Sequence, residues 1–243
     1  MTEFKIKNLV IGASVAFLAL ASTVPAMAQD AGDKTAYWAG IDFTDDSTFG
    51  YAGVAYALHD TLLEDGWLAR VGIGYGEYEY NTVAVSGLGV DGDNVRANAM
   101  VGYQKHFDTM LVSAFAGIDY NNHDLSPNDP GNDVDGSETG VMAQVEVRKN
   151  FDALTQLNLN VNYSTAYNNY YATARLERDL GSFKIGPQVT ALGSESFDHK
   201  RLGIYVATGD LLPVNLSFQA GQSWASRRGD DSPYIGFGIS NTF

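Results

Sequence analysis

The chain has 243 residues, a formal net charge of −14 and no cysteine. This charge excludes ordinary nucleic-acid binding, because contacts to phosphates need a basic surface, and we expect no nucleic-acid partner. The lack of cysteine excludes disulfides and thiolate metal sites. Aromatic residues make up 12% of the sequence and glycine occurs 26 times, which favours short strands and tight turns over helices.

The first 28 residues have the three parts of a secretory signal peptide. Lys5 and Lys7 form a short basic region, residues 9–21 are mostly apolar, and an A-x-A cleavage site ends at Ala28. The alternative is a membrane anchor, but the apolar run is shorter than the roughly 20 residues that a spanning helix needs. We therefore predict export, cleavage after Ala28 and one mature domain over residues 29–243.

Alternation of apolar and polar residues dominates the mature chain. Residues 156–163, for example, read Gln-Leu-Asn-Leu-Asn-Val-Asn-Tyr. Successive side chains of a strand point to opposite faces, so each such segment has one apolar face and one polar face. The pattern predicts twelve strands, over residues 35–44, 49–58, 66–80, 94–106, 109–121, 139–149, 155–165, 170–179, 183–193, 200–208, 212–222 and 233–243.

Strands of about ten residues are long enough to cross a bilayer when tilted. Closing the sheet removes every unpaired edge, as hydrocarbon requires. We therefore predict an all-β fold: a transmembrane, antiparallel, up-and-down β-barrel in the bacterial outer membrane. With the N-terminus in the periplasm, the two long connections, 82–93 and 122–138, lie outside the cell, and the periplasmic turns are short.

Three local features refine this prediction. Ile235, Phe237 and the terminal Phe243 share one strand face, which resembles the C-terminal signature of outer-membrane barrels; the alternative is an ordinary edge strand. Pro187 within a strand predicts a bulge or bend, because proline cannot donate to the ladder. Aromatic residues near strand ends predict interfacial girdles. These are Tyr37, Trp67, Tyr75, Tyr103, Tyr120 and Tyr163.

The polar strand faces are expected to line the lumen. Their charged residues are Arg70, Arg96, Arg148, Arg175, Lys184 and Arg201, with Asp42, Glu77, Glu79, Asp119, Glu146 and Glu177. This balance predicts internal ion pairs or a path for a neutral solute, whereas an anion channel needs a basic excess. Tyrosines share these faces and suit sugar rings, or simply fill the lumen. They include Tyr78, Tyr80, Tyr171, Tyr205 and Tyr234.

Signals of catalysis and of metal binding are weak. The acidic connection 122–138 lacks the EF-hand spacing, so we expect a solvated loop or, alternatively, loose cation bridging to lipopolysaccharide. The sequence has no G-x-S-x-G, H-E-x-x-H or P-loop motif. Ser194, Ser196 and His199 are close in sequence, which is common in polar loops. We expect no catalytic residue, no cofactor and no bound metal.

Several stretches of the mature chain carry a family resemblance. They are Tyr37-Trp38-Ala39-Gly40-Ile41-Asp42, the glycine- and tyrosine-rich residues 66–80, and Ile185-Gly186-Pro187 followed by Arg201-Leu202-Gly203. Together they resemble the cellulose biosynthesis protein BcsS family of alphaproteobacteria. The resemblance implies an accessory outer-membrane protein of cellulose production. It supplies no catalytic residue, and Arg70, Tyr78, Tyr80, Pro187 and Arg201 match it without assigned roles.

The sequence and the resemblance together predict a non-enzymatic barrel that helps export, anchor or organise cellulose. The alternatives are a small-solute porin, a structural barrel and, less favoured, a lipid or polysaccharide hydrolase. Expected partners are outer-membrane lipid, lipopolysaccharide, and cellulose or components of the cellulose-synthase complex. The residues expected in the lumen, as candidate glycan contacts, are Arg70, Tyr78, Tyr80, Arg96, Arg148, Arg175, Arg201 and Tyr205.

Overall fold

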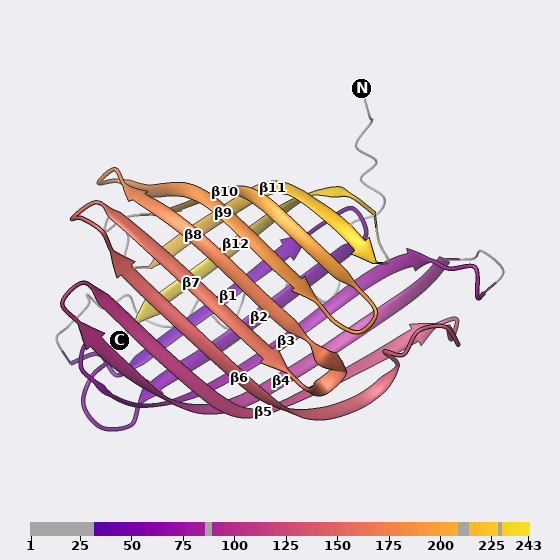
Figure 1. The fold of residues 1–243 in the computed structure, drawn as a ribbon, viewed down its shortest axis with the longest axis horizontal. Helices are drawn as coiled ribbons and strands as arrows, with labels where there is room; N and C mark the ends of the chain where they lie inside the picture. The colour runs from indigo at the N-terminus through magenta and orange to yellow at the C-terminus, as the bar shows by residue number, and fades with distance from the viewer. Residues whose placement is uncertain (1–31, 86–88, 209–213, 228–229) are drawn as a thin grey trace.

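The computed structural model describes residues 32–85, 89–208, 214–227 and 230–243, so the predicted signal peptide lies outside the described residues. Within them, twelve strands form one closed barrel in which β12 pairs with β1 (Figure 1). The strands are β1 (Thr35–Phe43), β2 (Ser47–Ala57), β3 (Gly66–Asn81), β4 (Gly89–Phe107), β5 (Met110–Ser126), β6 (Gly136–Asn150), β7 (Thr155–Ser164), β8 (Tyr170–Asp179), β9 (Phe183–Gly193), β10 (Asp198–Thr208), β11 (Asn215–Arg227) and β12 (Ser232–Thr242). A 3-10 turn, η2 (Ala166–Asn168), follows β7. The predicted fold class is confirmed.

The two ends of the barrel differ. At one end the chain closes on itself, since Thr35 N donates to Phe243 O and Phe243 N donates to Thr35 O, both at 2.8 Å. We call this the turn end. At the opposite end β3 to β6 project beyond the other strands (Figure 1), and we call this the extended end. These four strands have 15 to 19 residues, against 9 to 13 for the others.

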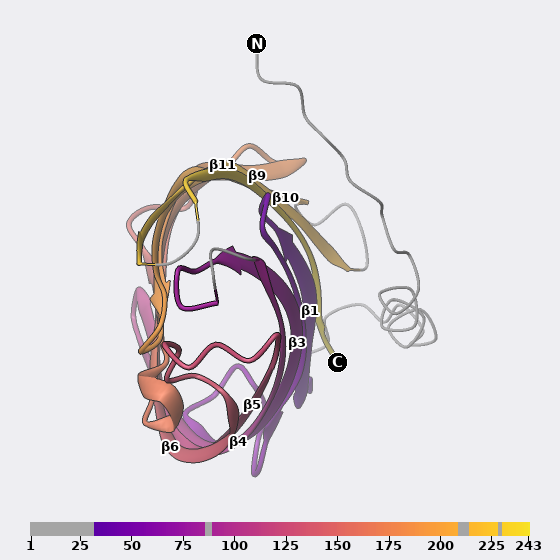
Figure 2. The same cartoon turned by 90° about the vertical axis from the view of Figure 1, so that its right-hand side faces the viewer.

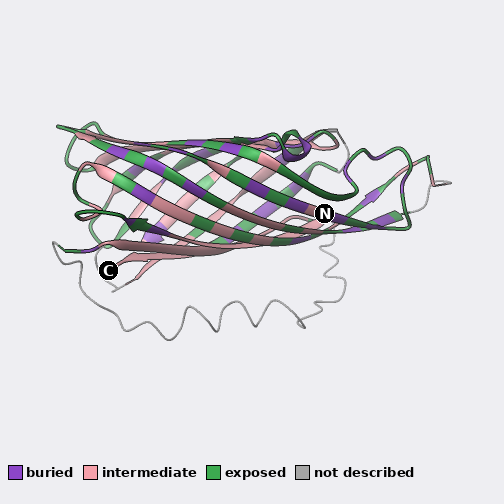
Figure 3. Cartoon of the chain, turned by 90° about the horizontal axis from the view of Figure 1, so that it is seen from below, coloured by how far each residue is buried: buried purple, intermediate pink, exposed green. Residues whose placement is uncertain are grey.

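Exposed and less exposed residues alternate along the strands (Figure 3). On β5, Ile118 is 62% exposed on the outside, whereas its neighbour Asp119 is fully buried on the inside. Large apolar side chains are exposed all around the barrel, as a lipid-facing wall requires. They include Val71, Ile73, Val101, Val141, Val145, Val161, Val189, Leu202, Ile204, Phe218 and Phe237. No helix within the described residues is long and apolar enough to span a bilayer.

Two sequence predictions about the strands were wrong in detail. The expected long loops 82–93 and 122–138 are shorter than predicted, because β4 starts at Gly89, β5 runs to Ser126 and β6 starts at Gly136. Backbone hydrogen bonds between strands do not require an apolar face. The strands therefore stay paired beyond the point where apolar and polar residues stop alternating. Pro187 causes no bulge: the pairing of β8 with β9 keeps one register on both sides of it and only lacks the pairs opposite it. The register shift lies beside His199 instead.

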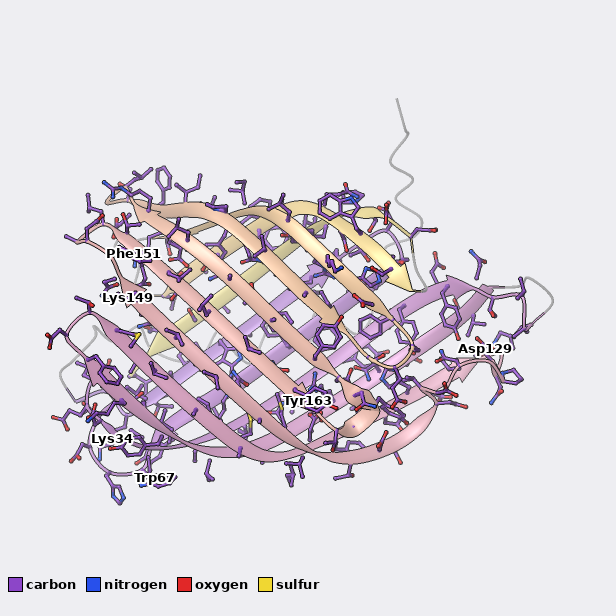
Figure 4. All side chains as sticks on the ribbon, in the orientation of Figure 1. Lys34, Trp67, Asp129, Lys149, Phe151 and Tyr163 are labelled. Atoms are coloured by element: carbon purple, nitrogen blue, oxygen red, sulfur yellow. The ribbon has the colours of Figure 1, made fainter. Side chains whose placement is uncertain are left out.

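Aromatic side chains gather near both ends of the apolar wall. Near the turn end, Trp67 and Tyr103 pack edge to face with ring centroids 5.5 Å apart. Towards the extended end, Tyr75, Tyr120 and Tyr163 are exposed. Figure 4 shows Trp67 and Tyr163 displaced from each other along the barrel. This arrangement is that of the interfacial girdles in outer-membrane barrels.

Candidate functional site

The interior contains one large cavity of about 1700 Å³. Its lining starts at Asp33 and Thr242 near the turn end and reaches Asp46 and Tyr80 near the extended end. The cavity therefore follows the whole length of the barrel. Much of its lining is polar, with asparagine and glutamine amides from β4, β5, β6 and β7.

Four of the predicted lumen cations form ion pairs among the described residues. The N–O distance is 3.0 Å in Arg96–Asp119, 3.3 Å in Arg175–Glu177 and 3.8 Å in Arg201–Asp42, and Arg70 contacts Glu146 directly. Charges inside a barrel lose part of their hydration, so each needs a partner of opposite sign. The expected internal pairing is confirmed for these four.

A chain of hydrogen bonds joins two of these pairs, Arg175–Glu177 and Arg201–Asp42, along one wall. Arg175 Nε donates to Gln188 Oε1 at 2.8 Å. Gln188 Nε2 donates to Gln219 Oε1 at 2.5 Å, and Gln219 Nε2 donates to Asp42 Oδ1 at 2.7 Å. The network thus runs from β8 through β9 and β11 to β1, and it holds the guanidinium of Arg175 and the carboxylate of Asp42 in fixed positions.

Three guanidinium groups also lie over aromatic rings. Arg175 Cζ is 3.5 Å from the ring centroid of Tyr205. Arg70 Cζ is 4.2 Å from that of Trp38, and Arg201 Cζ is 5.1 Å from that of Tyr234. Such contacts are favourable because the ring face is electron-rich. They also cover one face of each ring, so Tyr205, a predicted glycan contact, is here the packing partner of Arg175.

The balance of lumen charges differs from the sequence prediction. Glu77 and Glu79 alternate with Tyr78 on β3, so their side chains lie on the opposite face, and Tyr75 Oη donates to Glu77 at 3.0 Å. Both residues border the cavity, but their side chains point away from the lumen, because one face of a strand cannot carry both Glu77 and Tyr78.

Two cations of the lumen consequently remain without a carboxylate. Arg148 and Lys184 both line the cavity. Across the described residues, no carboxylate oxygen lies within ion-pair distance of either. Both lie on the turn-end side of the four pairs, near the last residues of β6 and the first of β9.

The extended end is organised around Tyr80. Tyr80 Oη donates to Asp129 Oδ2 at 3.0 Å and accepts from Asn132 Nδ2 at 2.8 Å. Tyr167 Oη donates to the carbonyl of Asp135 at 3.0 Å. These bonds hold the β5–β6 connection within the outline of the barrel opening (Figure 2). Tyr80, a predicted glycan contact, is buried under this connection, which is only in part the solvated loop that the sequence predicted: Asp129 and Asn132 are buried, whereas most of its other residues are exposed.

Tyr78, the neighbouring candidate, has a different environment. Its Oη lies 2.9 Å from His123 Nδ1, and His123 Nε2 lies 2.8 Å from Asn94 Nδ2. Its ring packs over Gly92 on β4, where a β-carbon would lie 2.4 Å from Tyr78 Cζ. Tyr78 lines the cavity, as expected.

At the turn end, the β2–β3 connection folds towards the interior. Gln104 Nε2 on β4 donates to the carbonyls of Leu62 and Glu64, at 2.9 and 2.6 Å. The backbone N–H of His106 and the ammonium of Lys105 bond Asp65 and hold its pKa at about 2. The contacts of Gln104 could not be predicted from the sequence, because an amide on the lumen face has many hydrogen-bond partners within reach.

The serine and histidine side chains that are close in sequence make two separate contacts. Ser194 and Ser196 contact each other at 3.4 Å between Oγ atoms. His199 Nδ1 lies 3.2 Å from the Oγ of Ser223 on β11. Within the described part of the chain, no group of three or more His, Asp and Glu side chains is placed to hold a metal ion.

Comparison with known proteins decides the family. A family model described as cellulose biosynthesis protein BcsS matches residues 36–243. The chain belongs to the BcsS family. The predicted resemblance is thereby confirmed, and it covers the whole barrel. No curated protein matches the chain.

Solved structures similar to this BcsS barrel include a translocator domain, a channel and a porin. The translocator domain of the autotransporter NalP from Neisseria meningitidis is 9% identical, with a TM-score of 0.51 and coverage of 95% of this chain and 94% of that one. A deletion mutant of the TodX monoaromatic hydrocarbon channel is 9% identical, with a TM-score of 0.54 and coverage of 89% and 91%. KdgM porin is 11% identical, with a TM-score of 0.46 and coverage of 86% and 99%. At these identities the likeness concerns the fold alone.

Proposed function

We propose that this BcsS-family barrel holds a segment of glucan in its lumen during export or anchoring of cellulose at the outer membrane, without catalysing a reaction. The observation that carries the proposal is the cavity of about 1700 Å³ that follows the barrel from end to end. A barrel that only anchored other proteins would gain nothing from a polar interior of this size. Membership of the BcsS family supplies the link to cellulose.

The chemistry of the interior supports a neutral polymer. Four cations are engaged by carboxylates, and three of these also lie over aromatic rings. The uncharged polar groups that the wall offers to a passing chain are mainly amide groups and tyrosine hydroxyls. Such groups exchange hydrogen bonds with sugar hydroxyls without requiring a charge on the ligand.

We place the turn end in the periplasm and the extended end outside the cell. Short turns face the periplasm and longer segments face outwards in outer-membrane barrels. The outward segments then carry many carboxylates, including Asp124, Asp129, Asp133, Asp135 and Glu138. These would face lipopolysaccharide or the emerging polymer, and the periplasmic turns would face the cellulose-synthase machinery.

The same cavity also favours a second function, that of a small-solute porin. Its lining residues come from both ends of the barrel, as a conduction path requires. The connections that lie within both openings of the barrel argue against a general porin. Ion conductance in planar bilayers that cello-oligosaccharides do not reduce would favour the porin.

The test of the proposed function uses a clean deletion strain with complementation. External cellulose and synthase activity in isolated membranes are measured together. We expect external cellulose to fall, or its architecture to change, while synthase activity stays normal. Unchanged cellulose in amount and architecture would overturn the cellulose role and leave the porin or a structural barrel.

A further inference from the structure

Two aromatic side chains on the lumen face of β2 take no part in the network of ion pairs and hydrogen bonds described above. Phe49 and Tyr51 both line the cavity. Their ring centroids are 6.4 Å apart and their planes differ by 26°. Neither was singled out from the sequence, because residues 49–57 of β2 do not alternate in polarity.

Both rings lie flat against the barrel wall because the residues that they cover are glycines. A β-carbon at Gly40 would lie 2.5 Å from Tyr51 Cζ. One at Gly74 would lie 2.6 Å from Phe49 Cζ, and one at Gly76 would lie 2.7 Å from Phe49 Cδ2. Real β-carbons do not approach other atoms this closely, so only glycine permits the packing. Each ring has one face on the backbone, and the ring borders the cavity.

A third ring continues this surface towards the extended end. Tyr78 is two residues beyond Gly76 on the same face of β3, and it packs over Gly92 in the same manner. The three rings thus follow the wall formed by β2 and β3 from the middle of the barrel outwards. Tyr80, the next residue on that face, is buried under the β5–β6 connection.

Phe49 and Tyr51 differ from three other lumen aromatics in what covers them. Trp38, Tyr205 and Tyr234 each have a guanidinium over the ring. Among the described residues, no guanidinium or ammonium lies over Phe49 or Tyr51. Their open faces are therefore available to an apolar surface of a ligand.

We propose that Tyr51, Phe49 and Tyr78 form a stacking track for a neutral β-linked glucan. A flat β-linked glucan presents C–H groups on the faces of its sugar rings, and such faces pack on aromatic rings while the hydroxyls at the edges stay hydrogen-bonded. Asn98 on β4 lines the same cavity, and its amide has no hydrogen-bond partner among the described residues. The track deepens the proposed function and rests on it for the identity of the polymer.

The test measures binding of cellohexaose to the purified barrel in lipid nanodiscs by calorimetry. The double variant Phe49→Leu/Tyr51→Leu removes both rings but keeps apolar volume, and Tyr51→Phe keeps the ring. Tyr163→Leu, on the exposed outer face, is the matched control. We expect the double variant to weaken binding by about tenfold or more, and the other two to change it by less than about twofold.

Two comparisons make the test decisive. Each variant must retain wild-type β-sheet content and resistance to unfolding in detergent, and for a double variant that does not, the single variant Phe49→Leu replaces it. Maltohexaose, an α-linked and curved chain, should bind more weakly than cellohexaose. Equal affinity of wild type and double variant, or equal binding of the two sugars, would overturn the track.

The outcome separates the track from the proposed function. If ring removal leaves cellohexaose binding intact while the deletion strain loses external cellulose, the track is wrong and the function stands. If ring removal abolishes binding while the deletion strain makes normal cellulose, the track stands as a glucan site and the cellulose role fails.

Discussion

The wall of the barrel and its extended end differ in how their side chains are arranged and stabilised. In the wall, apolar side chains face outwards and charged residues face inwards in pairs, as for Ile118 and Asp119 on β5. In the extended part, the same strand carries polar groups on both faces, and side-chain bonds such as Tyr80–Asp129 hold it together. The difference shows that lipid imposes the pattern of the wall, whereas the extended end is stabilised by particular contacts.

The largest expected effect comes from breaking a buried pair of the wall. Asp119→Ala leaves the guanidinium of Arg96 without its carboxylate, which both Nε and Nη2 contact at 3.0 Å. We expect the free energy of unfolding to fall by about 3–5 kcal/mol. Urea unfolding of the barrel in lipid vesicles measures it. The double variant Arg96→Met/Asp119→Leu should recover most of the loss, and equal loss in both would refute the pairing argument.

A lysine placed on the outer face compares the two regions directly. Ile118 is 62% exposed in the wall, and Val95 is 45% exposed where the wall gives way to the extended end. Ile118→Lys should destabilise by about 2–4 kcal/mol, because lipid must accept the charge, and Val95→Lys by about 0–1 kcal/mol. The same urea assay applies. Similar losses of stability in the two variants would show that the boundary of the lipid does not lie at the girdle residues.

At the extended end, removing one hydroxyl should act locally. Tyr80→Phe deletes the group that donates to Asp129 and accepts from Asn132. Opening of the β5–β6 connection should become easier by about 1–3 kcal/mol, since both polar partners lose a bond while largely buried. Hydrogen exchange of residues 127–135 reports it. Tyr120→Phe, at an exposed tyrosine, is the control, and the urea midpoint should not move in either variant.

The smallest effect concerns the β2–β3 connection at the turn end. The pKa of Asp65 is lowered from 3.8 to about 2 by the bonds from His106 N–H and Lys105. Because the pKa is lowered in the folded state, the stabilising contribution of the Asp65 carboxylate is present above about pH 4 and is lost as the pH falls towards 2. Hydrogen exchange of His106 should accelerate over this range in the wild type. In Asp65→Asn the rate should show no such step, and a step in that variant would assign the change to another group.

The sequence predicts the strands of the wall well because lipid enforces alternation there. All twelve were found, and β9 has its expected bounds, 183–193. The prediction failed at β4, β5 and β6 beyond the girdle residues. Neither face of these strands contacts lipid there, so apolar and polar residues do not alternate. The lost alternation was interpreted as a loop, although backbone pairing continues to Ser126.

For the candidate site, sequence reasoning identified residue types but not their partners. Arg70, Arg175 and Arg201 were expected in the lumen and line it. That each lies over an aromatic ring depends on neighbours from strands far apart in sequence, as for Arg175 on β8 and Tyr205 on β10. The glycines that let Phe49 lie flat are likewise visible only after β2 and β3 are in register.

The central claim is that glucan occupies the lumen, and filling the lumen in living cells tests it most directly. Asn160 and Asn162 on β7 line the cavity, and Val161 between them is 51% exposed on the outside. The deletion strain is complemented with Asn160→Trp/Asn162→Trp or with Val161→Trp, at equal amounts of barrel in the membrane. External cellulose should stay at the deletion level with the lumen pair and return to wild type with Val161→Trp. Full restoration by the lumen pair would contradict the claim.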